Sequence, residues 1–507
     1  MAQDYFRDAA ASGDLRRQTV RGGVATVIAQ AITTLTTLAA IPVLARLLDP
    51  EDFGLIAMVT VFTNFAAMFV DAGLSLPTIQ RPRITAAQVS NLFWISVLIA
   101  LTVACVVASA SPLIAWVFDE PRLVGITLAI VTSFVFAGLS VQHTALLRRQ
   151  LMFASLSAVQ VVSVASGQAC AVGWAFAYRD TEFDYWALVI GPIASSAITA
   201  AMAWVFCSWR PSAPKPRTGT RELASFGAQI TGFSILNYLS RNADSFLIGW
   251  KWGDVALGYY DRAYRVFLAP IVRITVPFAT VTVPALSRLS HDAPRFERAY
   301  LRLLRPALSL PCPLAMLMLL NAELVIDTML GPRFEQSIPI FRCLALVGLV
   351  QPFCHSLTWI LTALGRGKAV LTIGVLSAVV KCTAFACGLP WGPVGVAAAY
   401  AIASLFVYTP IAVAYVHSQS PFSIVGPLKE FAMAQALGLV VGVASVASMA
   451  VFSGDNPWVR LLIVGLVGAA TWGLVVAGTG YGRALIADFR GIRGGAVGGA
   501  PSAPSAQ

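Results

Sequence analysis

The stretch QVSNLFWISVLIALTVACVVASAS, residues 88–111, decides the fold class of this chain. It contains no Asp, Glu, Lys or Arg over 24 residues. A helix needs about 20 consecutive apolar residues to cross the hydrocarbon core of a bilayer. Lipid is the solvent that accepts apolar surface on the outside of a protein, so the stretch predicts a transmembrane helix.

The composition of the whole chain agrees with this prediction. Of its 507 residues, 57% are hydrophobic and 12% are charged, and the mean hydropathy is +0.75. In soluble domains about a quarter of all residues are charged. No long polar stretch separates the apolar blocks. The chain is therefore predicted to be an all-α polytopic membrane protein and not a series of soluble domains.

Apolar segments recur along the chain and predict about 14 transmembrane helices. The predicted spans are 22–47, 54–80, 88–111, 122–146, 155–178, 185–208, 223–250, 255–288, 300–322, 337–364, 368–389, 393–417, 429–452 and 457–480. The eighth span contains Pro270, Pro277 and Pro284. We expect kinks there, because each proline removes a backbone hydrogen-bond donor.

Charges between the predicted spans alternate in sign. Basic residues such as Arg148 and Arg149 gather in every second loop, and acidic residues such as Asp119 and Glu120 gather in the others. Cytoplasmic loops carry an excess of Lys and Arg, so the pattern predicts a multi-pass protein of the bacterial inner membrane with both termini in the cytoplasm. The net charge of +11 fits these loops and does not indicate nucleic acid.

Polar stretches divide the chain into predicted parts. The loop WRPSAPKPRTGTRE is rich in proline and charge, and we interpret it as an extended linker between two six-helix lobes. The predicted parts are a cytoplasmic N-terminal segment at 1–21, an N-lobe at 22–208, the cytoplasmic linker at 209–222, a C-lobe at 223–417, two extra C-terminal helices at 418–480 and a partly disordered cytoplasmic tail at 481–507.

The two lobes are predicted to be pseudo-symmetric repeats. Gly23 and Gly54 are 31 positions apart, and Gly227 and Gly258 have the same spacing. In each copy the second glycine ends an acidic outer turn, DPEDFG at 49–54 and GDVALG at 253–258. Repeats within a membrane protein imply two lobes around a shared cavity, with the substrate bound between them.

Ionisable residues inside the predicted spans are the candidates for function. Each costs roughly 2.5–3.5 kcal/mol to insert, so we expect them to face a water-filled interior. Guanidinium groups match phosphate oxygens in bidentate geometry, so a cationic stripe suits an anionic headgroup. The candidate headgroup ligands are Arg262, Arg265, Arg273, Arg241 and Lys381, and the candidates for ion coupling or gating are Asp244, Asp71 and Asp261.

Several of these candidates also have a structural interpretation, which the sequence leaves open. Arg241 lies three positions before Asp244, and Asp261 lies four before Arg265, so both pairs could be ion pairs on one helix face. Lys381 could instead extend its amine to the membrane surface.

Asp71 precedes Gly73 in VDAGLS and could cap a helix break there. Arg273 has no acidic residue nearby in sequence and is the stronger ligand candidate.

Signals for an enzyme are weak. The four histidines and eight cysteines have no metal-ligand spacing, and the chain contains no HExxH, GxSxG or P-loop motif. We predict no catalytic residue, no metal and no cofactor.

Four stretches resemble the Wzx-type polysaccharide flippases, in the branch of the colanic-acid exporters. They are ARLLDPEDFGLIAMVTVF at 45–62, DAGLS at 71–75, LLRRQLMFASLS at 146–157, and NADSFLIG with ALGYYDRAYRV between 242 and 266. The last is the most specific, and the similarity extends over roughly residues 15–420. These flippases belong to the superfamily of the MATE antiporters and the lipid II flippase (the MOP superfamily).

The resemblance implies a bundle of two lobes that works by alternating access. It implies a substrate, an undecaprenyl-diphosphate-linked oligosaccharide, that moves from the cytoplasmic to the periplasmic leaflet for exopolysaccharide, capsule or lipopolysaccharide synthesis. It implies that Arg262 and Arg265 are cavity residues near the diphosphate, and that H⁺ or Na⁺ drives transport. We expect a monomer in the phospholipid bilayer, with a glycan polymerase as a candidate partner.

Three other functions stay open at this point. A lipid II flippase would share the fold, and a MATE-like efflux antiporter would favour a more acidic cavity. A membrane-embedded glycosyltransferase or polymerase would be expected to have a larger catalytic loop outside the membrane.

Overall fold

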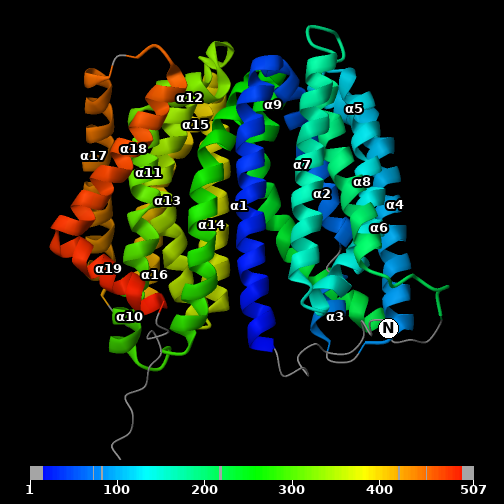
Figure 1. Cartoon of the computed structure of the whole chain (residues 1–507), viewed down its shortest axis with the longest axis horizontal. Coiled ribbons are helices and arrows are strands. Elements are labelled where there is room, and N and C mark those ends of the chain that lie inside the picture. The colour runs from blue at the N-terminus through cyan, green and yellow to red at the C-terminus, as the bar shows by residue number, and fades with distance from the viewer. Residues whose placement is uncertain are drawn as a thin grey trace, which may run out of the picture. The chain divides into compact units, whose positions relative to one another are not determined.

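A computed structural model of the chain describes residues 15–71, 74–81, 84–215, 220–420, 423–452 and 454–493 (Figure 1). Every regular element within these ranges is a helix, which confirms the predicted all-α fold. The residues group into two compact units, of which the first ends at Gly258 and the second begins at Tyr259. The predicted division into lobes, with its linker at 209–222, stays a prediction.

The first unit contains the helices up to the middle of α9. They are α1 (Leu15–Leu47), α2 (Pro50–Asp71), α3 (Ser75–Gln80), α4 (Ala86–Phe118), α5 (Arg122–Ile130), α6 (Thr132–Arg149), α7 (Phe153–Ala177), η2 (Asp184–Trp186), α8 (Ala187–Phe206) and the first part of α9 (Thr220–Ser287). Local capping places some of these boundaries. The Thr85 hydroxyl accepts the Gln88 N–H before α4, and Asp119 ends that helix in the left-handed conformation at φ 55°.

The second unit contains the rest of α9 and ten further α-helices. They are α10 (Ala293–Ser309), α11 (Pro311–Leu320), α12 (Ala322–Leu330), α13 (Ser337–Ala363), α14 (Gly367–Gly388), α15 (Gly392–Ile402), α16 (Thr409–Gln419), α17 (Val425–Val451), α18 (Pro457–Gly478) and α19 (Gly480–Arg493), with the short helices η3 (Pro332–Phe334), η4 (Leu389–Trp391) and η5 (Ala403–Tyr408) between them. The segment η5 is a π-helix.

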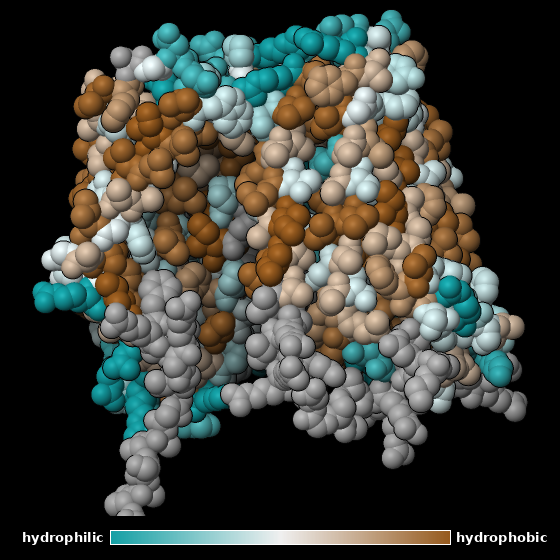
Figure 2. All heavy atoms as spheres, viewed as in Figure 1, coloured by the Kyte–Doolittle hydropathy of each residue, from teal (hydrophilic) through white to brown (hydrophobic). Residues whose placement is uncertain are grey.

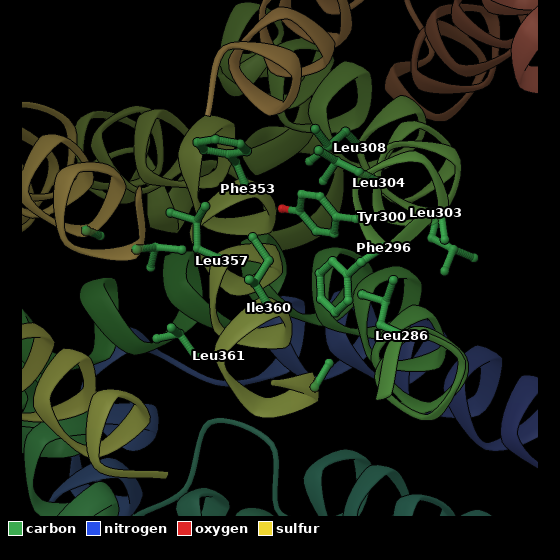
Figure 3. Close-up of a cluster of buried hydrophobic side chains, with 14 of the residues drawn as sticks. Leu286, Phe296, Tyr300, Leu303, Leu304, Leu308, Phe353, Leu357, Ile360 and Leu361 are labelled. Atoms are coloured by element: carbon green, nitrogen blue, oxygen red, sulfur yellow. The ribbon is translucent and has the colours of Figure 1, made fainter. Parts of the chain in front are cut away.

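The core of the second unit forms where α10 meets α13 (Figure 3). Tyr300 of α10 is fully buried with Phe353 and Leu357 of α13. Its hydroxyl lies 2.9 Å from the Ser356 hydroxyl, so the one polar atom of this aromatic ring is satisfied inside the core. Packing of this kind fixes the α10 side chains that reach the C-terminal helices.

The predicted spans lie in helical parts of the structure, although several of them, such as 54–80, are divided between two or more helices. Eleven helices within the described residues are long and apolar enough to cross a membrane, or up to twelve if the bent pair in α9 is one span. One of them, Gly367–Gln419, has 53 residues and turns at Leu389–Trp391 before Gly392 at φ 73°. A straight helix of that length would measure about 80 Å, more than twice the bilayer core. The count of about 14 stays a prediction.

Helix α9 is interrupted twice. Gly253 has φ 80°, which lies outside the helical region, and it separates the seventh predicted span from the eighth. The axis then bends by 43° between Asn242–Val272 and Pro277–Ser287. The second bend agrees with the kink predicted from the three prolines.

The surface of the described residues is suited to lipid. Large apolar side chains such as Trp116, Val205 and Phe406 are 78%, 78% and 74% exposed. Figure 2 shows apolar side chains across the middle of the visible face and hydrophilic ones toward both ends. Exposed apolar surface on this scale requires a lipid solvent, and the chain is a multi-pass membrane protein.

Candidate functional site

Three of the eight predicted site residues form one ionic cluster on α9 in the second unit. The Arg265 Nε lies 2.9 Å from Asp261 Oδ1 and 2.8 Å from Oδ2. The Arg262 Nε donates to Asp261 Oδ2 at 3.1 Å, and its Nη2 contacts the same oxygen. One carboxylate therefore serves two guanidinium groups, and the cluster keeps one positive charge.

The two arginines of this cluster differ in exposure. The Arg262 side chain is 14% exposed and Asp261 is 12% exposed, whereas Arg265 is 52% exposed. A buried guanidinium needs a charged partner to remain stable, and Asp261 supplies it for Arg262. Arg265 is half exposed, so an anionic group can reach its side chain.

The other predicted site residues lie apart from this cluster or outside the described side chains. Asp244 is buried on α9 within the first unit, and its Oδ1 accepts the Ser245 N–H at 2.8 Å. Lys381 is half-buried on α14, within electrostatic range of the Cys354 thiol.

Arg241, Arg273 and Asp71 belong to helices of the structure, but their side chains lie outside the described part. Their roles stay predictions. Helix α2 does end at Asp71, at the position where the sequence allowed a helix break.

Two glycines of the predicted repeat make a reciprocal contact within the first unit. A Cβ on Gly54 of α2 would lie 1.8 Å from the Asp254 carbonyl oxygen, and a Cβ on Gly258 of α9 would lie 1.8 Å from the Pro50 carbonyl oxygen. Pro50 and Asp254 hold the same place before the glycine in DPEDFG and GDVALG. The contact requires glycine on both helices, and the repeat stays a prediction.

Arg122 joins the acidic residues around this contact. Its guanidinium binds Glu51 at 2.6 Å, Glu120 at 2.8 Å and Asp254 at 3.4 Å, which come from α2, the α4–α5 turn and α9. The hydrogen bond from Arg122 lowers the pKa of the Glu120 carboxyl. The sequence analysis did not select Arg122, although it is a basic residue in the acidic outer turn DEPR at 119–122.

A second ionic cluster ties the C-terminal helices to α10. Arg305 binds Glu430 of α17 and Asp488 of α19, each at 2.6 Å, and its guanidinium carbon lies 5.7 Å from the centre of the Tyr481 ring. Burial raises the pKa of the Asp488 carboxyl, and Arg305 opposes that rise. This cluster anchors α17 and α19 and offers no open ligand site.

The chain was compared with known protein families. The model of a family described as polysaccharide biosynthesis protein matches residues 43–339, more than half of the chain. The chain belongs to this family.

Curated relatives agree with the family. The chain is 25% identical to the lipopolysaccharide biosynthesis protein WzxC of Escherichia coli K12, over 69% of this chain and 71% of the relative. It is 25% identical to the teichuronic acid biosynthesis protein TuaB of Bacillus subtilis 168, over 60% and 62%. It is 23% identical to the succinoglycan biosynthesis transport protein ExoT of Rhizobium meliloti 1021, over 69% and 70%.

Solved structures confirm the fold. The inward closed form of the lipid II flippase MurJ matches with a TM-score of 0.69 at 16% identity, over 89% of this chain and 97% of that chain. An inward-facing MATE transporter of the MOP superfamily matches with a TM-score of 0.57 at 15% identity, over 81% and 98%. The predicted relationship to polysaccharide biosynthesis proteins of the WzxC kind is confirmed, and the fold is the one that these two structures share.

Proposed function

We propose that the protein is a flippase that moves a lipid-linked oligosaccharide from the cytoplasmic to the periplasmic leaflet by alternating access. The match of the polysaccharide biosynthesis family over residues 43–339 carries this proposal. The fold shared with a lipid II flippase supports it, because that fold suits a large lipid-linked headgroup. The protein acts as a transporter in polysaccharide synthesis and makes no covalent bond.

Arg265 is the residue that we assign to the anionic part of the substrate. Its side chain is half exposed on α9, and Asp261 binds its Nε, so the two Nη groups remain as candidate donors to an anion. Arg262 has the supporting role, because it neutralises the same carboxylate from a buried position. Arg241, Arg273 and Lys381 are further proposed ligands, and Asp244 and Asp71 are proposed for coupling or gating.

The remaining proposed features rest on the loop charges and on the resemblance to the Wzx-type flippases. The protein acts as a monomer in the bacterial inner membrane with both termini in the cytoplasm, and H⁺ or Na⁺ drives the cycle. A glycan polymerase on the periplasmic side is the expected consumer of the product.

A flipping assay in proteoliposomes tests the proposal. The probe is a fluorescent undecaprenyl-diphosphate oligosaccharide, and Arg265→Ala is compared with Arg295→Ala. Arg295 is a suitable control because it is 59% exposed and pairs with Asp292, the N-cap residue of α10, at a position outside the predicted spans. Loss of a charge-assisted hydrogen bond costs about 1.5–3 kcal/mol, so Arg265→Ala should slow flipping at least about tenfold.

Three results can follow from this assay. Wild-type flipping that is lost only in Arg265→Ala supports both the function and the site. Wild-type flipping that persists in Arg265→Ala removes that residue from the site and leaves the function. A wild-type protein that moves no such lipid but expels organic cations is an efflux antiporter, and the proposal is wrong.

A further inference from the structure

Helix α1 has a face of uncharged polar residues within its membrane span. At 100° per residue these side chains fall within an arc of about 100°. They are Thr26, Gln30, Thr33, Thr34 and Thr37. The span from Ala25 to Leu47 is one of the helices apolar enough to cross a membrane, so a polar face there needs a reason.

The opposite face of α1 is the one that suits lipid. Ile28 and Leu35 are 54% and 66% exposed and lie on that side, whereas Val27, which is 69% exposed, lies at the edge of the polar face. Ala29 and Thr33, at 3% and 4% exposure, are buried on the side where α1 packs against α7 (Figure 1). The polar face therefore borders the α1–α7 contact and lies on a different side of α1 from Ile28 and Leu35.

Helix α7 adds a second carboxamide beside this face. Gln160 is exposed within the span Phe153–Ala177, and its Nε2 donates to Gln30 Oε1 at 3.4 Å. A carboxamide offers two donors and two acceptor lone pairs, so one long hydrogen bond leaves most of this capacity unused. Hydrocarbon cannot satisfy it, because an amide placed there without partners costs several kcal/mol. Gln160 therefore faces water or a polar ligand.

The threonines of this face are oriented as acceptors. Thr34 donates its hydroxyl to the Gln30 carbonyl oxygen at 2.6 Å, and Thr37 donates to the Thr33 carbonyl oxygen at 2.8 Å. Each hydroxyl proton is thus used inside the helix, and the oxygen lone pairs remain for a ligand that donates. A surface of carboxamides and hydroxyl acceptors without charge suits a neutral, hydroxyl-rich molecule.

We propose that this α1–α7 polar face binds the sugar part of the substrate: the Gln30 and Gln160 carboxamides form hydrogen bonds with sugar hydroxyls, and the threonine oxygens accept hydrogen bonds from them. The inference rests on the proposed flippase function and assigns a second subsite to it. Charged residues hold the anionic part of the lipid, and the neutral face holds the glycan. The neutral face adds binding affinity that depends on the sugar and not on the diphosphate.

The experiment measures equilibrium binding of two probes to the full chain in nanodiscs. One probe is undecaprenyl diphosphate with an attached oligosaccharide, and the other is undecaprenyl diphosphate without sugar. The variant Gln30→Leu/Gln160→Leu is compared with wild type. Thr102→Val is the control, because Thr102 is an exposed threonine on α4 whose hydroxyl also donates to its own helix, at 2.8 Å from the Leu98 carbonyl oxygen.

We expect the double variant to bind the sugar-bearing lipid at least about tenfold more weakly and the sugar-free lipid equally well. Thr102→Val should bind both probes as wild type does. Equal binding of the sugar-bearing lipid by wild type and double variant would overturn the inference, as would an equal loss for both probes. Wild-type protein that binds neither probe contradicts the proposed function itself, which separates the two failures.

Discussion

Asp261 illustrates how far single residues can be predicted. The spacing of four between Asp261 and Arg265 indicated an ion pair, and the structure contains it. The sequence could not show that Arg262 shares the same carboxylate from a buried position, because burial depends on the helices packed around α9. It also could not pair Arg122 with Asp254, which is 132 positions away.

Within the cluster of Asp261, Arg262 and Arg265, substitution of Asp261 should affect stability more than substitution of Arg265. Asp261→Ala leaves the buried Arg262 without its carboxylate, and removing one partner of a buried ion pair costs about 3–5 kcal/mol. Arg265→Ala removes a half-exposed partner and should cost less than about 1 kcal/mol. Thermal unfolding in detergent measures both variants. A larger loss of stability in Arg265→Ala than in Asp261→Ala would contradict this assignment.

The ion cluster of Arg122 with Glu51, Glu120 and Asp254 should lose stability in acid. Arg122 holds the pKa of Glu120 below its ordinary value of 4.5, so Glu120 contributes stability above that pH and loses it as pH falls through the folded-state pKa. Glu120→Gln should therefore have a lower melting temperature than wild type at neutral pH. The difference between the two melting temperatures should shrink below about pH 4.5. Glu335→Gln, which removes an exposed carboxylate elsewhere, should show no such convergence.

At the scale of elements, hydropathy predicted the long helices, but not the breaks within them. The predicted span 54–80 is two helices, α2 and α3. The Arg149 guanidinium donates to the carbonyl oxygens of Thr78 at 3.0 Å and Arg81 at 2.6 Å, and so satisfies the end of α3 from 71 and 68 positions away. The residues next to α3 in the sequence do not predict this cap, because its donor, Arg149, is distant in the sequence.

The contact between α2 and α9 should tolerate no side chain at its glycines. Gly54→Ala and Gly258→Ala should each lower the melting temperature, since overpacking costs about 1–3 kcal/mol. The double variant should lose less than the sum, because both changes disrupt one contact. Gly125→Ala on α5 is the control, since nothing lies within 4 Å of its Cβ position. Full additivity of the two changes would contradict the reciprocal contact.

At the scale of the whole molecule, the sequence predicted a polytopic all-α protein and its relationship to polysaccharide biosynthesis proteins. The physical reason is that lipid cannot satisfy backbone polar groups, so a spanning segment must be an apolar helix. Hydropathy and loop charge therefore predict most of the architecture. Hydropathy and loop charge cannot predict whether the proposed ligands surround one cavity, because that depends on how helices distant in sequence turn toward each other. Arg241, Arg273 and Asp71 therefore stay predictions.

Orientation in the membrane has a direct test. With both termini in the cytoplasm, green fluorescent protein fused after Gln507 should fluoresce, and alkaline phosphatase fused there should be inactive. Alkaline phosphatase inserted after Asp119 should be active, because that acidic turn is predicted to be periplasmic. Phosphatase activity at the C-terminus would reverse the predicted topology.

The glycine contact has a further consequence. Position 50 of one copy touches 258 of the other, and 254 touches 54, which is the relation that a two-fold axis imposes on the subunits of a homodimer. If the predicted repeat is correct, the Gly54 contact and the Gly258 contact are equivalent, as two contacts related by the axis of an isologous dimer are.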